Sequence, residues 1–198
     1  NNHLGVPLTL ANMPLATRFA VIEMGMNHAR EIALLSGWVK PDVSIITTVD
    51  AVHIEFFGTV EAIADAKAEI FEGMGGKGFA VLNRDNPHFK RLAKAAEAQG
   101  LDRIISFGTH ADAVCRMTHY SVAVDDEAKE PHAGDVSPER GESARLLPPP
   151  PQPSPYWGGS IVEAVIGGTP VAYRLGTIGK HWALMSVAVL GVVDALGA

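Results

Sequence analysis

Three side chains of types that bind hard cations or transfer protons interrupt the apolar segments of this chain: Glu23, His53 and Lys67. Glu23 closes the apolar run FAVIE, and His53 follows the run IITTV. Both runs read as short buried strands, and parallel sheets carry their chemistry just beyond the carboxyl ends of strands. A carboxylate and an imidazole there suit a hard divalent cation such as Mg²⁺, held partly by phosphate oxygens. Each residue alone is more simply explained as a polar residue at a strand end.

Lys67 is the most informative of the three. In a helix predicted over residues 59–72, with Thr59 as its N-cap, the apolar stripe comprises Val60, Ile63, Ile70 and Phe71, while Glu61, Asp65, Glu69 and Glu72 gather on the opposite side. Lys67 falls inside the apolar stripe. One interpretation is a lysine whose amine reaches the surface while its stem stays buried. The other is a desolvated lysine with a lowered pKa, available for covalent chemistry or modification.

Two further groups of polar residues lie at element ends. Asn83 and Asp85 follow the run AVLN, where an Asx turn before Pro87 explains them. His181 and Trp182 open the last predicted helix, where backbone N–H groups form an anion site, although a plain loop and first helical turn is the simpler explanation.

A glycine-rich segment, residues 73–78, matches G-x-G-x-x-G in letters only. A dinucleotide-binding fingerprint must leave a strand and open a helix, whereas these glycines end a predicted helix and lead into a strand. We therefore expect a helix C-cap and turn. The phosphate-cradling pattern G-x-x-x-x-G-K-[ST] does not occur in the chain.

The elements that must position these residues alternate along the chain. The patterns predict strands over 19–24, 42–49, 79–82 and 103–107, and helices over 29–35, 59–72 and 87–99. This alternation indicates an α/β fold with a mostly parallel sheet and helices on both faces. Runs over 161–166 and 170–175 flank Gly167-Gly168 as a smaller antiparallel hairpin region, and a closing helix is predicted over 181–196.

Composition excludes several classes of protein. With 47% hydrophobic and 19% charged residues the chain is globular, and its net charge of −6 argues against a nucleic-acid partner. The single cysteine, Cys115, fits a reducing compartment, so we expect a cytoplasmic protein, without membrane insertion and monomeric.

Residues 126–158 lie in a stretch with eight prolines and few helix or strand formers. This composition predicts a disordered proline-rich insertion, which could alternatively dock a proline-reading domain.

Several strings together resemble one family: NNHLGVPLTL, AVIEMGMNHAREIA, IITTVDAVHIEFFGTVEAIADAKAEIF, GFAVLNRDNPHF and GKHWALMSVAVL. They resemble the central ATP-binding domain of the Mur ligases, over nearly all of residues 1–198 apart from the insertion. Within the family they are most similar to the members that join D-alanyl-D-alanine to UDP-MurNAc-tripeptide in peptidoglycan precursor synthesis. The resemblance implies ATP and Mg²⁺ as cofactors, and phosphorylation of the substrate carboxylate to an acyl phosphate that an amine attacks.

The resemblance also assigns roles to individual residues. Glu23 and His53 match magnesium-site residues of the family, and Lys67 matches a lysine carried as a carbamate, so all three are metal-binding and catalytic candidates. The remaining candidates by position are Asn83, Asp85, His181 and Trp182 for the nucleotide, and Asn1 and Asn2 for the substrate.

The chain also departs from the family pattern. The family's G-x-H-N-x-x-N reads Gly-Lys-His-Trp182-Ala-Leu-Met185 here, so both asparagines are replaced. The family's phosphate loop, its uridine-nucleotide domain and its carboxy-terminal domain have no counterpart in these 198 residues. We therefore expect the isolated chain to be inactive as a fragment of an ATP-dependent ligase. The alternative is a catalytically inactive remnant or interaction module.

Overall fold

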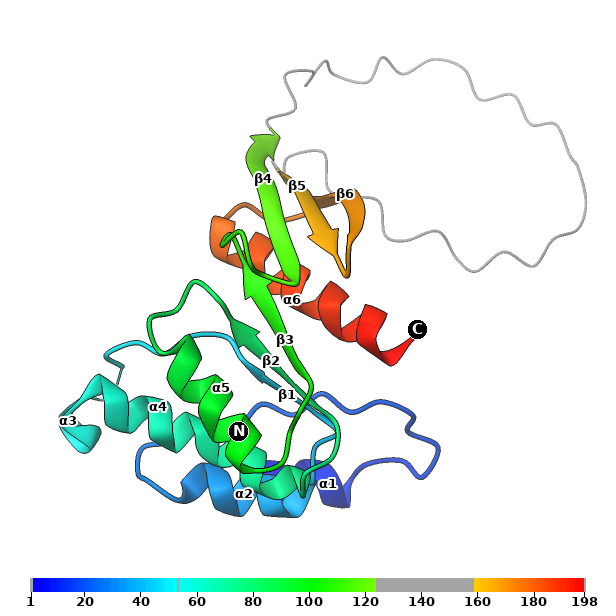
Figure 1. Cartoon of the computed structure of the whole chain (residues 1–198). Coiled ribbons are helices and arrows are strands. Elements are labelled where there is room, and N and C mark those ends of the chain that lie inside the picture. Colours follow the sequence, from blue (N-terminus) through cyan, green and yellow to red (C-terminus); the bar gives the residue numbers. More distant parts are fainter. Residues whose placement is uncertain (1, 53, 124–158, 198) are drawn as a thin grey trace, which may run out of the picture.

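One six-stranded sheet forms the centre of the computed structural model, which describes residues 2–52, 54–123 and 159–197 (Figure 1). The strands follow chain order: β1 (Val43–Ile46), β2 (Phe79–Asn83), β3 (Ile104–Gly108), β4 (Cys115–Ala123), β5 (Gly159–Ile166) and β6 (Thr169–Leu175). Strands β1 to β4 pair in parallel, and β4, β5 and β6 pair antiparallel. The predicted α/β class, with its mostly parallel sheet, is confirmed.

Six α-helices and one 3₁₀ segment surround the described part of this sheet. They are α1 (Gly5–Ala11), α2 (Glu31–Val39), α3 (Ile54–Phe57), α4 (Val60–Ala68), η1 (Glu69–Met74), α5 (Phe89–Ala98) and α6 (Lys180–Leu196). Helix α4 begins as predicted, because the Thr59 side chain accepts a hydrogen bond from the Ala62 amide at 3.1 Å.

Alternate residues of β2 serve two separate cores, one on each face of the sheet. Phe79 and Val81 face α6, with Phe107 and Val187 in the same cluster. Ala80 and Leu82 face the other side, in a cluster that also contains side chains of α4, η1 and α5. Because strand side chains alternate between faces, one apolar strand fills both layers, and the prediction of helices on both faces is confirmed.

The predicted strand over residues 19–24 is wrong. The segment is a loop that joins no strand ladder, with Phe19 68% and Val21 101% exposed. Its Ile22 and Met24 are half-buried, so the apolar alternation of a strand is present. A strand also needs hydrogen bonds to a neighbour, and within the described residues β1 pairs only with β2.

Other elements differ in extent from the sequence prediction. Helix α2 begins later than predicted and continues through Gly37 to Val39, and α1 and α3 were not predicted. Strand β4 was also missed, because its mixed sequence CRMTHYSVA lacks a clear apolar period. The antiparallel part is therefore three strands rather than a hairpin alone. In the confirmed hairpin, Gly167 and Gly168 have φ of 54° and 91°, as a type I′ turn requires.

The glycine segment is the helix end and turn that the sequence predicts. Gly75 caps η1 in the left-handed conformation at φ 60°, and β2 follows after Gly78. Gly78 has φ 80°, and a Cβ there would overlap the Asp42 carbonyl oxygen. The glycines are thus explained by backbone geometry.

The predicted insertion over 126–158 lies outside the described residues. Within the described residues, no helix is long and apolar enough to cross a lipid bilayer.

Candidate functional site

Lys67 lies in the last turn of α4 and is half-buried. Burial lowers the pKa of its amine, because removing water penalises the charged form. The neighbouring Ala66 and Ile63 are 2% and 1% exposed, which places this helix face against the core. This partial burial supports the desolvated lysine that the sequence allowed, and the choice between the two interpretations stays a prediction.

The structure describes only one of the other two metal-site candidates. Glu23 is exposed, in the loop that replaces the predicted strand. His53 lies outside the described residues, between β1 and α3. Among the residues that the structure describes, no three His, Cys, Asp or Glu side chains form a metal-binding cluster. A shared site of Glu23, His53 and Lys67 stays a prediction.

Asn83 and Asp85 form the turn after β2. The Asn83 side chain donates to the Thr47 carbonyl at 3.0 Å and accepts from the Asp85 amide at 2.9 Å, which makes it an Asx turn. Asn83 thereby ties the carboxyl ends of β1 and β2 together at the edge of the sheet where open α/β folds bind ligands.

The Asp85 carboxylate reaches across to the end of β3. It accepts hydrogen bonds from the Thr109 amide at 2.7 Å, the Thr109 hydroxyl at 2.9 Å and the His110 amide at 2.8 Å. Burial opposes its ionisation, but these three donors outweigh that effect, and the pKa of Asp85 is lowered. Gly108, at φ 152°, leaves room for the carboxylate, because a Cβ there would lie only 2.6 Å from Asp85 Oδ1. Asp85 therefore shapes the Thr109–His110 loop directly.

His181 and Trp182 lie in the first turn of α6. Their rings are tilted by 44° with centroids 5.0 Å apart, and Trp182 is 52% exposed. The Gly179 amide just before the helix donates to the Tyr120 hydroxyl at 3.0 Å, which fixes the helix start against β4. Met185, at the second replaced asparagine position, packs against the core under α6.

The two amino-terminal candidates have different outcomes. Asn1 lies outside the described residues. Asn2 accepts hydrogen bonds from the Leu4 and Gly5 amides, both at 3.0 Å, and so supports the start of α1. The structure thus gives Asn2 a role in the fold.

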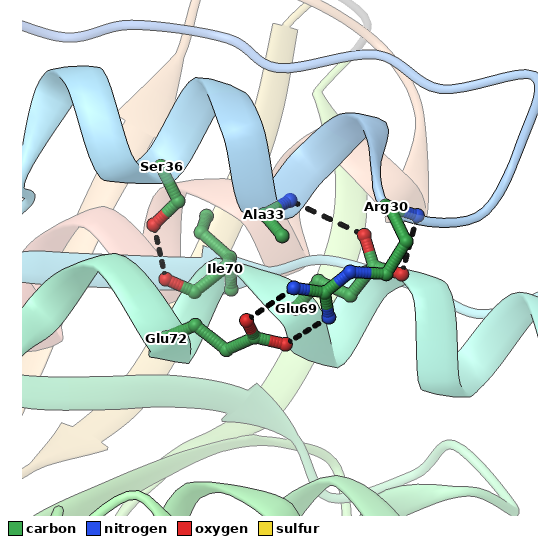
Figure 2. A network of polar contacts seen from close by, with 6 residues as sticks. All are labelled: Arg30, Ala33, Ser36, Glu69, Ile70 and Glu72. Carbon is green, nitrogen blue, oxygen red and sulfur yellow. Dashed lines mark hydrogen bonds and ion pairs between the residues drawn. The ribbon is translucent and has the colours of Figure 1, made fainter.

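Sequence reasoning missed a polar network between α2 and η1 (Figure 2). It contains Arg30, Glu69 and Glu72, and Glu69 is only 8% exposed although the sequence placed it on the acidic side of its helix. A cavity of about 500 Å³ lies beside the network, lined by residues including His28, Phe56, Asp65 and Glu69. In the sequence, Glu69 is visible only as an acidic residue four positions before the glycine turn. That position does not by itself reveal a hydrogen-bond partner near residue 30.

The fold and these strand-end residues define an α/β domain of the type that binds ligands at the carboxyl edge of its sheet. Comparison with known proteins agrees: the model of the Mur ligase middle domain matches residues 1–142. The chain therefore belongs to the Mur ligase middle domain family.

Curated relatives specify the similarity further. The chain is 34% identical over 120 residues to UDP-N-acetylmuramoyl-tripeptide–D-alanyl-D-alanine ligase of Rickettsia prowazekii, covering 61% of this chain and 27% of that protein. It is 40% identical over 112 residues to the ligase of the same name from Bacillus subtilis, covering 57% of this chain and 23% of that protein. The chain thus matches about a quarter of the length of these relatives.

Solved structures support the same fold. MurF from Acinetobacter baumannii superposes with a TM-score of 0.75 at 23% identity, covering 100% of this chain and 35% of that one. MurF from Thermotoga maritima in complex with ADP gives a TM-score of 0.72 at 23% identity, covering 100% of this chain and 37% of that one.

Proposed function

We propose that this chain is the middle-domain part of an ATP-dependent ligase that joins D-alanyl-D-alanine to UDP-MurNAc-tripeptide in peptidoglycan precursor synthesis. The observation that carries the proposal is the family match over residues 1–142, which includes Glu23, His53, Lys67 and Asp85. The names of the curated relatives supply the substrates. The single buried cysteine is consistent with the reducing cytoplasm as its location.

Lys67 provides the chemical argument. Only a neutral amine attacks CO₂, and burial favours the neutral form of Lys67 by lowering its pKa. Attack forms an N–C bond as one C=O π bond of CO₂ opens, and the nitrogen then releases one proton, which leaves a carbamate with a single negative charge shared by two oxygens. A desolvated lysine would thereby become a hard oxygen ligand at the inner face of α4.

Glu23 and the Lys67 carbamate would supply the hard oxygen ligands that Mg²⁺ prefers, and His53 would complete the set that the family resemblance implies. The ion would supply charge neutralisation for the phosphates of ATP and of the acyl phosphate. Asn83 orients the ends of β1 and β2, and Asp85 holds the Thr109–His110 loop at the same edge. The exposed indole of Trp182 offers a face on which the nucleotide base can stack, beside His181.

The test uses the full-length protein that contains this chain. Ligation is followed as phosphate release that requires ATP, UDP-MurNAc-tripeptide and D-alanyl-D-alanine together. Replacing Lys67 by Ala should lower turnover at least about a hundredfold, because the metal site loses a ligand, and added bicarbonate should not restore it. Lys77→Ala is the matched control, since Lys77 is exposed in the glycine turn.

Unchanged turnover in Lys67→Ala would contradict the proposed role of Lys67. A wild-type protein without any substrate-dependent phosphate release would contradict the proposed ligase activity, and would favour the alternative of a catalytically inactive remnant.

A further inference from the structure

Glu69 caps a helix that lies more than thirty residues earlier in the chain. It starts η1 directly after α4, and its carboxylate accepts hydrogen bonds from the Arg30 amide at 2.7 Å and the Ala33 amide at 3.2 Å (Figure 2). The first N–H groups of any helix lack partners within the helix. Glu69 satisfies two of them at the start of α2, and it does so with only 8% of its surface exposed.

Helix α2 has no cap of its own. Arg30 occupies its N-cap position in the left-handed conformation, at φ 73°, and makes no capping hydrogen bond with its side chain. Instead the Arg30 guanidinium pairs with Glu72, through Nη1–Oε1 at 2.6 Å and Nη2–Oε2 at 2.8 Å. This second contact is on the exposed surface, where ion pairs add little. The buried contact of Glu69 is therefore the one that fixes the backbone.

A second carboxylate holds the loop that leads into α2. Glu31 accepts hydrogen bonds from the Asn27 amide at 2.7 Å and the His28 amide at 3.2 Å, and these donors lower its pKa. Residues 27–33 are thus held at one end by Glu31 and at the other by Glu69. The loop that continues back from Asn27 carries Glu23.

We propose that Glu69 is a positioning residue that fixes the loop carrying Glu23 relative to the helix carrying Lys67. Glu69 follows Lys67 by two residues on a continuous helical path, since the α4 C-cap at Glu69 keeps helical angles of φ −55° and ψ −20°. A shift of α4 therefore moves Glu69, and with it the backbone of residues 30–33. The inference rests on the proposed function only in assigning Glu23 and Lys67 to one site.

Glu69→Gln tests the proposal, because it keeps the size of the side chain and removes its charge. Glu72→Gln is the matched control, since Glu72 contacts only the side chain of Arg30 in this network. Amide hydrogen exchange is measured by NMR on the full chain. We expect the Arg30 and Ala33 amides to exchange at least about tenfold faster in Glu69→Gln and within about twofold of wild type in Glu72→Gln.

The second readout separates positioning from a merely structural cap. In the full-length protein, Glu69→Gln should lower kcat at least about tenfold with KM for ATP within about twofold, and Glu72→Gln should change neither. Unchanged exchange in Glu69→Gln would overturn the proposal, as would faster exchange with an unchanged kcat. If Glu69→Gln does not fold, Glu69→Asp carries both measurements, because it keeps the carboxylate and shortens its reach.

Failure of the proposed ligase activity and failure of the Glu69 contact give different results. A wild-type protein without ligation would overturn the proposed function. Hydrogen exchange would still decide whether Glu69 holds residues 30–33, because that measurement needs no turnover.

Discussion

Two residues at the carboxyl edge of the sheet, both candidates for the nucleotide site, make contacts that hold the fold locally. Asp85 holds three donors from the loop after β3, and Asn83 holds the turn after β2. A residue with a role in nucleotide binding would thus be held in place by contacts within the chain. The same contacts make its contribution to stability measurable without any ligand.

Replacing Asp85 by Asn should lower the free energy of unfolding by about 1–2 kcal/mol at pH 7. This is the lower part of the range for hydrogen bonds to a charged group, because the side chain is exposed to solvent. Since the pKa of Asp85 is lowered in the folded state, its contribution is complete above the ordinary pKa of an aspartate. It is lost as the pH falls through the lowered folded-state value.

Urea unfolding at pH 7 and at pH 3 checks the Asp85 prediction. The difference between wild type and Asp85→Asn should shrink at the lower pH. The control Asp102→Asn, at an exposed position, should stay within about 0.5 kcal/mol of wild type. An equal difference at both pH values would show that the charge of Asp85 is not what holds the loop.

At the scale of elements, α2 and η1, which begins with Glu69, are in close contact. The two segments approach so closely that a Cβ on Gly73 would overlap the backbone carbonyl of Ser36. The Ser36 hydroxyl also donates to the Ile70 carbonyl across the same contact (Figure 2). The packing of these two segments therefore leaves no space for a side chain at position 73.

Two glycine substitutions, one at this contact and one in the open part of α2, should have opposite effects on stability. Gly73→Ala should destabilise the protein by about 1–3 kcal/mol, because backbone must move to make room. Gly37→Ala, inside α2 with nothing within 4 Å of the added carbon, should stabilise it by about 0.5–1 kcal/mol. Thermal unfolding followed by circular dichroism measures both, and a stabilising Gly73→Ala would contradict the close approach.

A deletion tests whether the domain needs the proline-rich segment between β4 and β5. Ala123 of β4 and Gly159 of β5 are direct partners in the antiparallel ladder, so a two-residue turn spans the gap between them. Replacing residues 124–158 by Asn-Gly should leave the Tm within about 3 °C of wild type, as expected of an insertion that the core does not need. A much lower Tm in a calorimetric scan would show that the segment packs on the domain.

At the scale of the whole molecule, the shared sheet joins the two cores into one unit. Leu82 is fully buried on the side of α4 and α5, while Val81 is fully buried on the side of α6. Both come from β2, which cannot lose its partners on one face without disturbing the other. Helices α4 and α6, which carry Lys67 and Trp182, pack on opposite faces of this strand.

Leu82→Ala should lower the free energy of unfolding by about 2–5 kcal/mol. Because the unit is cooperative, the slowest-exchanging amides of α5 and α6 should speed up by the same factor. Hydrogen exchange by NMR gives both values from one sample. Faster exchange confined to α5 would mean that the two cores unfold separately.

The sequence by itself determined the elements whose signals are local. The apolar runs of β1, β2 and β3, the Thr59 cap, the glycine turn and the Gly167-Gly168 hairpin follow from the periodicity and turn chemistry of adjacent residues. The position of Lys67 on the inner side of α4 also follows from a helical period of 3.6 residues.

Only the tertiary structure decided the features that depend on partners far along the chain. Residues 19–24 have the composition of a strand, but the described fold gives them no ladder. Strand β4 forms because β5 pairs with it, although its own pattern is weak. Glu69 looks like an exposed acidic residue until the start of α2 brings two amides to it. Hydrogen-bond partners 36 and 39 residues away leave no local pattern, and so the sequence alone did not reveal the contact between Glu69 and the start of α2.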